Sequence, residues 1–321
     1  MKNPASTKVI QFYRNFREFT GGHLKHWHYF NHVYYSATYL PYIYFGADTV
    51  WNPKNPWRHL NGAASHKSAF SQPLKKPDVL FIEGVSDWPV MQAAYTNLSQ
   101  IPIINLIQHV RHGDPADPRY AFLTQRAIRI CVSKAVESAL TETHRVNGPL
   151  ITIPCGVELA NLPAPLTNKP IEICIAALKN PELGQRLRQR LERDGHQVVL
   201  LAGRMARSHF LNAINQAKIT LFLPWQTEGF YLPALEGMAL NTLVVCPDCQ
   251  CNREFCQDGE NCWNPAYEGT KILSALNQAL AMSDEKRHQM LQQGQQTAKR
   301  YSLRAERRAF LNVLENLEQI W

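Results

Sequence analysis

The sequence contains no apolar run of bilayer length, no internal repeat and no low-complexity tract. A transmembrane helix is therefore not expected. The chain opens on a polar segment in place of a signal peptide, so we expect a cytoplasmic protein. In that compartment its eight cysteines should stay reduced.

Three motifs with defined chemistry are also missing. Gly21 and Gly22 follow the first expected strand but do not form GxGxxG, so a dinucleotide site has little support. His28 and His32 share a helix face, but without HExxH or a nearby acidic ligand they predict no metal site. The chain has no nucleic-acid-binding motif and no dense basic stripe, so we expect no nucleic-acid partner.

The length and charge of the chain set further limits. Its 321 residues suggest two domains, each large enough for its own core. The formal net charge of +8 favours anionic partners: nucleotide sugars, acidic polysaccharide, a phospholipid surface or nucleic acid. The charge alone does not choose among them.

Buried-strand patterns alternate with helical ones, which predicts an α/β fold with one domain in each half of the chain. A proline-rich segment at 158–170 is expected to be the hinge. The expected strands are 8–13, 78–82, 101–107, 129–133, 150–153, 171–177, 197–202, 219–223 and 242–246. The expected helices are 24–45 (one long helix or a pair), 88–97, 134–143, 182–194, 208–217, 234–240, 271–281, 284–300 and 303–320.

The segment 24–45 is rich in aromatic residues and histidines. We interpret its histidines as part of a solvated or acceptor-facing surface. Aromatic rings beside Lys25 also suit a membrane interface, which would place the protein at the inner face of the membrane. For the aromatic rings we favour a packed core over this membrane interface.

The stretch 223–264 carries the strongest pattern. A buried strand leads into a loop that holds Glu228, and Pro233 suits the first turn of the helix that follows. Asn241 accepts the left-handed conformation that ends such a helix. Glu228 and the helical Glu236 therefore lie eight positions apart, on either side of a helix N-terminus.

This spacing favours an elongated anionic ligand. Open α/β sheets bind ligands at the carboxyl ends of their strands, where Glu228 is expected. The exposed N–H groups at a helix start attract phosphate, and Glu236 lies beside them. A nucleoside diphosphate sugar has this layout, with sugar hydroxyls at one end, ribose hydroxyls at the other and diphosphate between them.

The residues of Glu228–Ala239, EGFYLPALEGMA, resemble the Glu-x7-Glu motif of retaining glycosyltransferases of family 4, which have the GT-B fold. Asp258–Asn261 resembles the DGxNG stretch that usually follows, with Cys262 in place of its last glycine. The resemblance covers most of the chain and is sharp only over 223–264.

The resemblance implies two Rossmann-like domains whose parallel sheets face each other across a cleft. Residues 1–160 would form the acceptor side and residues 168–301 the nucleotide-sugar donor side. A C-terminal helix at 302–321 would cross back onto the first domain. It also implies transfer with retention of anomeric configuration and no need for a metal or another cofactor.

The resemblance further assigns roles to the motif. Glu228 would hold hydroxyls of the transferred sugar, and Glu236 would accept hydrogen bonds from the ribose. Backbone N–H groups after Glu228 would help to bind the donor; they belong to Gly229, Phe230, Tyr231 and Leu232.

Residues outside the motif complete the implied site. Lys179, with help from Arg204, would offset the charge of the departing diphosphate. The arginine that the family shows near this lysine is missing, and Arg204 as a simple surface residue is the alternative. His109 and the pair Gly21–Gly22 would line the opposite wall. The alternatives are a buried structural histidine and a plain turn at the start of a helix.

Five of the eight cysteines fall within 246–262. The spacing Cys246-x2-Cys249-x-Cys251 partly matches zinc and redox sites but lacks a second paired knuckle. We favour reduced thiols, and a structural zinc and a redox pair are the alternatives.

We therefore predict a glycosyltransferase that moves a sugar from a nucleoside diphosphate sugar to a glycan, lipid-linked or other hydroxyl acceptor in polysaccharide or glycoconjugate synthesis. The alternatives are a non-catalytic GT-B-like protein that binds glycans or nucleotides, and a sugar-nucleotide epimerase.

Overall fold

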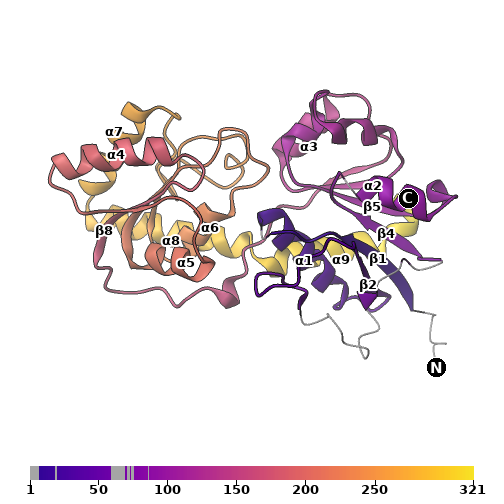
Figure 1. Ribbon diagram of the computed structural model, residues 1–321. Coiled ribbons are helices and arrows are strands. Elements are labelled where there is room, and N and C mark those ends of the chain that lie inside the picture. Colours follow the sequence, from indigo (N-terminus) through magenta and orange to yellow (C-terminus); the bar gives the residue numbers. More distant parts are fainter. Residues whose placement is uncertain (1–6, 19, 59–68, 71–72, 74–75, 86) are drawn as a thin grey trace. The chain divides into compact units, whose positions relative to one another are not determined.

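The computed structural model describes the chain apart from residues 1–6, 19, 59–68, 71–72, 74–75 and 86. The chain forms two compact units (Figure 1). Unit 1 combines Met1–Pro154 with Glu306–Trp321, and unit 2 is the continuous segment Cys155–Ala305. The last residues of the chain therefore return to the unit in which the chain began.

Unit 1 is built on a parallel sheet whose strand order, over the described residues, is β3-β2-β1-β4-β5-β6-β7. This order reverses between β1 and β4, as in doubly wound sheets that bind ligands at that switch point. The strands are β1 (Lys8–Arg14), β2 (Tyr39–Phe45), β3 (Ala69–Phe70), β4 (Val79–Ile82), β5 (Ile103–Ile107), β6 (Ile128–Cys131) and β7 (Leu150–Thr152).

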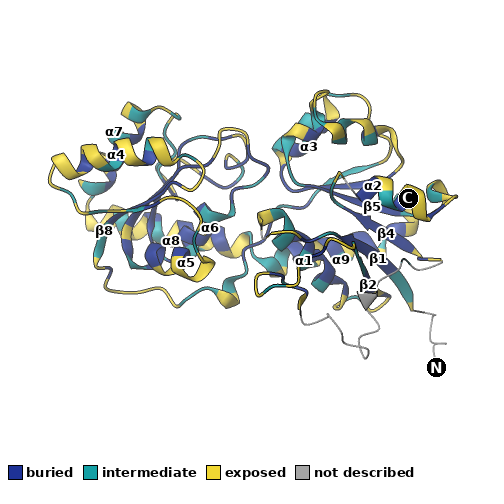
Figure 2. Ribbon diagram, in the orientation of Figure 1, coloured by how far each residue is buried: buried dark blue, intermediate teal, exposed yellow. Residues whose placement is uncertain are grey.

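Helices cover the sheet of unit 1, and its inner strands β4, β5 and β6 are fully buried (Figure 2). The α-helices are α1 (Gly21–Val33), α2 (Asp87–Ala94), α3 (Lys134–Thr141), α9 (Leu303–Glu315) and α10 (Leu317–Ile320). The 3-10 segments are η2 (Leu98–Gln100), η3 (Val110–Gly113) and η4 (Pro118–Thr124). Ser133 caps α3 as predicted, since its hydroxyl accepts a hydrogen bond from the N–H of Val136.

Unit 2 is built on a parallel sheet of order β11-β10-β8-β9. Its strands are β8 (Ile171–Ala176), β9 (Val198–Leu201), β10 (Ala217–Phe222) and β11 (Leu243–Val245). Its helices are α4 (Pro181–Arg193), α5 (Arg207–Gln216), α6 (Leu232–Ala239), α7 (Gly269–Leu280) and α8 (Asp284–Arg300), and η5 (Leu159–Asn161) precedes them.

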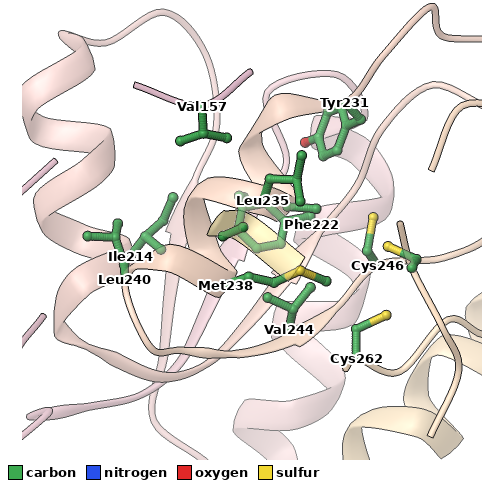
Figure 3. Packing of buried hydrophobic residues seen from close by; sticks show 14 of the residues in the cluster. Val157, Ile214, Phe222, Tyr231, Leu235, Met238, Leu240, Val244, Cys246 and Cys262 are labelled. Carbon is green, nitrogen blue, oxygen red and sulfur yellow. The ribbon is translucent and has the colours of Figure 1, made fainter. Parts of the chain in front are cut away.

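The two faces of the second sheet pack into separate hydrophobic clusters. Successive side chains of a strand point to opposite faces, so Leu221 and Phe222 of β10 belong to different clusters. Figure 3 shows Phe222 among Leu235 and Met238 of α6. The helix lies so close to the strand that a Cβ on Gly237 would come within 2.8 Å of the Phe222 ring. This close approach fixes the position of α6 and of the glutamate before Gly237.

The segment 24–45 corrects the sequence prediction. It does not form one long helix or a pair of helices, because α1 ends at Val33 and β2 follows. The Ser36 hydroxyl turns the chain by accepting the N–H groups of Thr38 and Tyr39 at 3.2 and 3.1 Å. Pro41 would interrupt a helix, but β2 tolerates it. Pro41 pairs with Ile10 of β1 on one side, and on the other side β3 pairs only with Ile43 and Tyr44.

The histidines of α1 also differ from their prediction. His26, His28 and His32 are buried, so the hypothesis of a solvated surface is wrong for them. For His32 the reason is α9, which brings Glu306 into contact with Lys25 and His32. His26 instead packs against the sheet residues Phe12 and Phe81 and against Trp57. Phe310 of α9 packs edge-on against Tyr29, at 4.8 Å between ring centroids.

Two buried histidines make the stability of unit 1 depend on pH. Burial lowers the pKa of His112 to about 3 and lowers the pKa of His32 as well. In the unfolded chain both groups titrate near their ordinary value, so below about pH 6.5 the unfolded state binds more protons. The full contribution of the two neutral histidines to the stability of unit 1 is present above pH 7. We expect the free energy of unfolding to fall by up to about 1.4 kcal/mol per histidine for each pH unit below 6.

Urea unfolding measured at pH 7, 6 and 5 checks this expectation. The variant His112→Gln should show a shallower loss between pH 7 and pH 5 than the wild type. Equal pH slopes in the two proteins would contradict the assignment to His112.

Candidate functional site

Glu228 and Glu236 flank the start of α6. The loop 223–231 follows β10, Tyr231 precedes the helix, and proline lies in its first turn as predicted. The predicted left-handed conformation of Asn241 after the helix is confirmed by its φ of 57°. Both carboxylates are buried, with only 8% of Glu228 and 2% of Glu236 exposed. Buried carboxylates need partners, so the groups around them define the site.

Glu228 lies beside Lys179. The Lys179 ammonium is 3.6 Å from Oε1 of Glu228, and the backbone N–H of Trp225 donates to the same oxygen at 3.4 Å. Lys179 follows β8 and Glu228 follows β10, and these two strands are paired in parallel. The contact therefore lies at the carboxyl edge of the second sheet, where α/β proteins bind ligands.

Trp225 is a member of this cluster that the sequence analysis missed. Its indole N–H donates to the carbonyl of Lys179 at 2.8 Å, and the Lys179 ammonium lies 4.2 Å from the centre of its ring. A tryptophan in a loop three residues before Glu228 was the available signal.

Arg207 is the arginine that contacts Glu236. Its Nη2 is 2.5 Å from Oε1 of Glu236, and it is the first residue of α5. Arg204, expected to help Lys179 at the diphosphate or to be a simple surface residue, is exposed in the preceding loop. Both arginines lie just before or at the start of α5, and only the path of the backbone decides which one turns toward Glu236.

The second oxygen of Glu236 is unsatisfied. Oε2 is buried and has no hydrogen-bond partner among the described residues. A buried acceptor without a donor costs about 1–3 kcal/mol, so a bound hydroxyl or N–H at this position would be favourable. The carboxylate is therefore arranged to accept a hydrogen bond from a ligand while Arg207 holds its other oxygen.

The predicted backbone donors come from the end of the loop and the start of α6. Leu232 is the first residue of α6, so its N–H has no intrahelical acceptor. The ring of Phe230 packs against Phe255, at 5.3 Å between centroids, and Tyr231 is buried against Phe222. These ring contacts hold the backbone of Gly229 and Leu232, which adjoin the two aromatic residues.

Three predicted site residues lie in unit 1, and their role as ligand contacts remains a prediction. His109 follows β5, is half-buried, and its Nδ1 accepts the N–H of Arg111 at 3.1 Å. Gly21 and Gly22 form the first turn of α1. Gln108 donates to the carbonyl of Gly22 at 3.3 Å, which brings the end of β5 to the start of α1.

A buried ionic group at the switch point of the first sheet was also missed. Arg14 ends β1 and Glu83 follows β4, and their side chains approach to 2.7 Å. Nδ1 of His26 lies 2.5 Å from the same carboxylate oxygen. Burial by itself raises the pKa of Glu83, but Arg14 and His26 outweigh it and lower that pKa.

The cysteines of 246–262 are all buried. Cys249 and Cys251 have their sulfurs 3.5 Å apart, and Asn252 donates to the sulfur of Cys246 at 3.3 Å. Within the described residues no group of three or more His, Cys, Asp or Glu side chains could hold a metal ion. Nor is any described helix both long and apolar enough to cross a membrane.

Residues 160–297 match the family model "Glycosyl transferases group 1". The matched range contains Glu228, Glu236 and most of unit 2. A comparison with curated proteins found no match.

Solved structures resemble the whole chain. HepE from Anabaena, determined with UDP and glucose, has a TM-score of 0.71 at 13% identity, over 96% of this chain and 100% of HepE. A glycosyltransferase from Rickettsia africae has a TM-score of 0.71 at 12% identity, over 97% of this chain and 99% of that one. Sucrose-phosphate synthase from Thermosynechococcus elongatus has a TM-score of 0.69 at 12% identity, over 97% and 99%. The fold is that of GT-B glycosyltransferases, as the sequence predicted.

Proposed function

We propose that this protein is a glycosyltransferase that takes a sugar from a nucleoside diphosphate sugar and transfers it, with retention of anomeric configuration, to a hydroxyl of a glycan or lipid-linked acceptor. The observation that carries the proposal is the pair of buried carboxylates, Glu228 and Glu236, on either side of the start of α6. The match of this region to group 1 glycosyl transferases supports it. UDP in the similar structure of HepE favours a uridine nucleotide.

Glu236 is proposed to bind the ribose. Its buried Oε2 lacks a partner, and a ribose hydroxyl would donate the missing hydrogen bond. Arg207 fixes the carboxylate from the other side, so the acceptor oxygen is already oriented before the nucleotide binds. Such preorganisation reduces the ordering cost of binding.

Glu228 and Lys179 are proposed to act at the sugar and the diphosphate. Glu228 accepts hydrogen bonds from sugar hydroxyls. When the bond between the anomeric carbon and the phosphate oxygen breaks, negative charge grows on the departing diphosphate. The Lys179 ammonium and the N–H groups at the start of α6 can stabilise that charge without reorganising.

Acceptor binding is assigned to unit 1. His109 is assigned to the donor sugar or the acceptor, Gly21 and Gly22 are assigned to the donor, and Arg204 in unit 2 is a further anion contact. No metal or other cofactor is assigned a role. A cytoplasmic location, with peripheral attachment to the inner face of the membrane, fits a lipid-linked acceptor.

Release of nucleoside diphosphate tests the function. The purified protein is incubated with UDP-glucose and other nucleotide sugars, with and without glycan or lipid-linked acceptors. A transferase releases the diphosphate in an acceptor-dependent way, and NMR of the product shows whether the anomeric configuration is retained. Binding without release identifies a non-catalytic protein, and a sugar epimerised on an intact nucleotide identifies an epimerase.

Glu236→Ala is expected to weaken nucleotide binding about tenfold or more, because the ribose loses a hydrogen bond to a charged acceptor. Isothermal titration with UDP measures the change, and a thermal melt checks the fold. The control Glu285→Gln alters an exposed glutamate of the same unit and should bind as the wild type does. Unchanged affinity in Glu236→Ala would remove the ribose assignment.

A further inference from the structure

Trp225 is a large apolar side chain that unit 2 leaves on its surface. It is 52% exposed, so burial of the ring in a core does not account for its position. The side chain is nevertheless held in place, because its indole N–H donates to the Lys179 carbonyl at 2.8 Å. An indole that is hydrogen-bonded yet exposed, next to the buried Glu228, is expected to have a role other than core packing.

The contacts of Trp225 converge on one residue. The indole N–H binds the backbone of Lys179, and the face of the same ring lies 4.2 Å from the ammonium of that lysine. The backbone N–H of Trp225 also donates to Glu228, the carboxylate that attracts the Lys179 ammonium. Trp225 therefore bridges the loops that follow β8 and β10.

An exposed lysine side chain needs contacts that restrain its conformation. Its four-carbon stem is flexible, and its ammonium is strongly hydrated, so an unsupported lysine samples many rotamers in solvent. The side chain of Lys179 is 40% exposed, and a single contact of 3.6 Å to Glu228 restrains it weakly. An aromatic face attracts a cation through its quadrupole and adds a second restraint from another direction.

We propose that Trp225 is a positioning residue that holds the Lys179 ammonium beside Glu228, where it meets the sugar-bearing phosphate of the donor. The inference rests on the proposed function. It deepens that function by naming the residue that orients Lys179. Trp225 acts through the lysine and not through a contact of its own with the nucleotide.

Comparing the binding of UDP and UMP distinguishes this positioning role from a general effect of Trp225 on nucleotide binding. UMP lacks the second phosphate, so it cannot use a lysine placed at that phosphate. Trp225→Ala should weaken binding of UDP about fivefold and leave binding of UMP unchanged. Trp225→Phe keeps an aromatic face for the ammonium but loses the indole N–H, so it should fall between Trp225→Ala and the wild type.

A double-mutant cycle supplies the deciding measurement. In the Lys179→Met background, Trp225→Ala should cause no further loss of UDP affinity, because the residue through which it acts is gone. Trp51→Ala, which removes an exposed tryptophan of unit 1, is the matched control and should bind both nucleotides as the wild type does. Thermal melts of all variants confirm that unit 2 stays folded.

The outcomes distinguish this inference from the function on which it rests. A thermal-shift screen with UDP, ADP, GDP and CDP first selects the base, and the matching mono- and diphosphate are then titrated. If no diphosphate binds the wild type, the proposed function fails. If the diphosphate binds but Trp225→Ala weakens both nucleotides equally, or still weakens the diphosphate in the Lys179→Met background, only the positioning role is overturned.

Discussion

Replacing Glu228 with glutamine is expected to lower the rate of sugar transfer by about 100-fold or more while unit 2 stays folded. The amide has nearly the shape of the carboxylate but carries no charge. It binds sugar hydroxyls more weakly and no longer attracts the Lys179 ammonium, which lies 3.6 Å away in the native site. Initial rates of nucleoside diphosphate release at saturating donor measure the effect.

The control for this experiment is Glu285→Gln, which removes the charge of an exposed glutamate in α8 of the same unit. Its rate should equal that of the wild type. A Glu228→Gln enzyme with more than a third of the native rate would show that Glu228 plays no part in transfer.

Replacing Glu306 with alanine is expected to destabilise unit 1 by about 3–5 kcal/mol. Burial alone would raise the pKa of this carboxyl, but Lys25 and the hydrogen bond to His32 lower it to about 2. Removal of the carboxylate leaves the Lys25 ammonium, which is only 2% exposed, without its counter-charge. Urea unfolding at pH 7 measures the loss.

The ion pair of Lys8 and Glu318 is the matched control, because it also joins the first strand region to the C-terminal helices but is exposed. Glu318→Ala should leave the unfolding midpoint unchanged. Glu306→Gln keeps the volume and one acceptor, so it should fall between Glu306→Ala and the wild type. Equal midpoints for Glu306→Ala and Glu318→Ala would contradict a structural role for the buried group.

Local sequence signals were sufficient for most of unit 2. Its strands carry short apolar runs, and the predicted ranges 171–177 and 197–202 enclose the observed β8 and β9. Pro233 and Asn241 marked the two ends of α6 because each has a backbone preference of its own. The strands β8 and β9 and the helix α6 can therefore be predicted from local sequence alone, without knowing which distant residues contact them.

Unit 1 was harder to predict because distant residues decide its local structure. The histidines of α1 look solvated on their own, but His32 is buried against α9, contributed from the other end of the chain, and His26 is buried against Phe81 and Trp57. The aromatic run of β2 has no alternation of polar and apolar residues, and its place in the sheet follows from its pairing with β1 and β3. Patterns within a short window cannot reveal such partners.

The candidate site shows the same division. The pair Glu228 and Glu236 could be found from the sequence because both residues lie in one continuous segment, one in the loop and one in the helix that follows. The partners of these carboxylates, Arg207 and Trp225, could not be assigned because their roles depend on how neighbouring loops meet across the sheet edge.

The return of the chain to unit 1 also bears on the order of events during synthesis. Lys25 leaves the ribosome 281 residues before Glu306, which balances its charge in the finished protein. Unit 2 is continuous, so it has all its residues available before α9 is made. Bringing α1 and α9 together costs chain entropy, and the contacts that offset this cost can form only after α9 has been synthesised. The later-made half of this protein is therefore expected to fold first, and the earlier half to wait for its final helix.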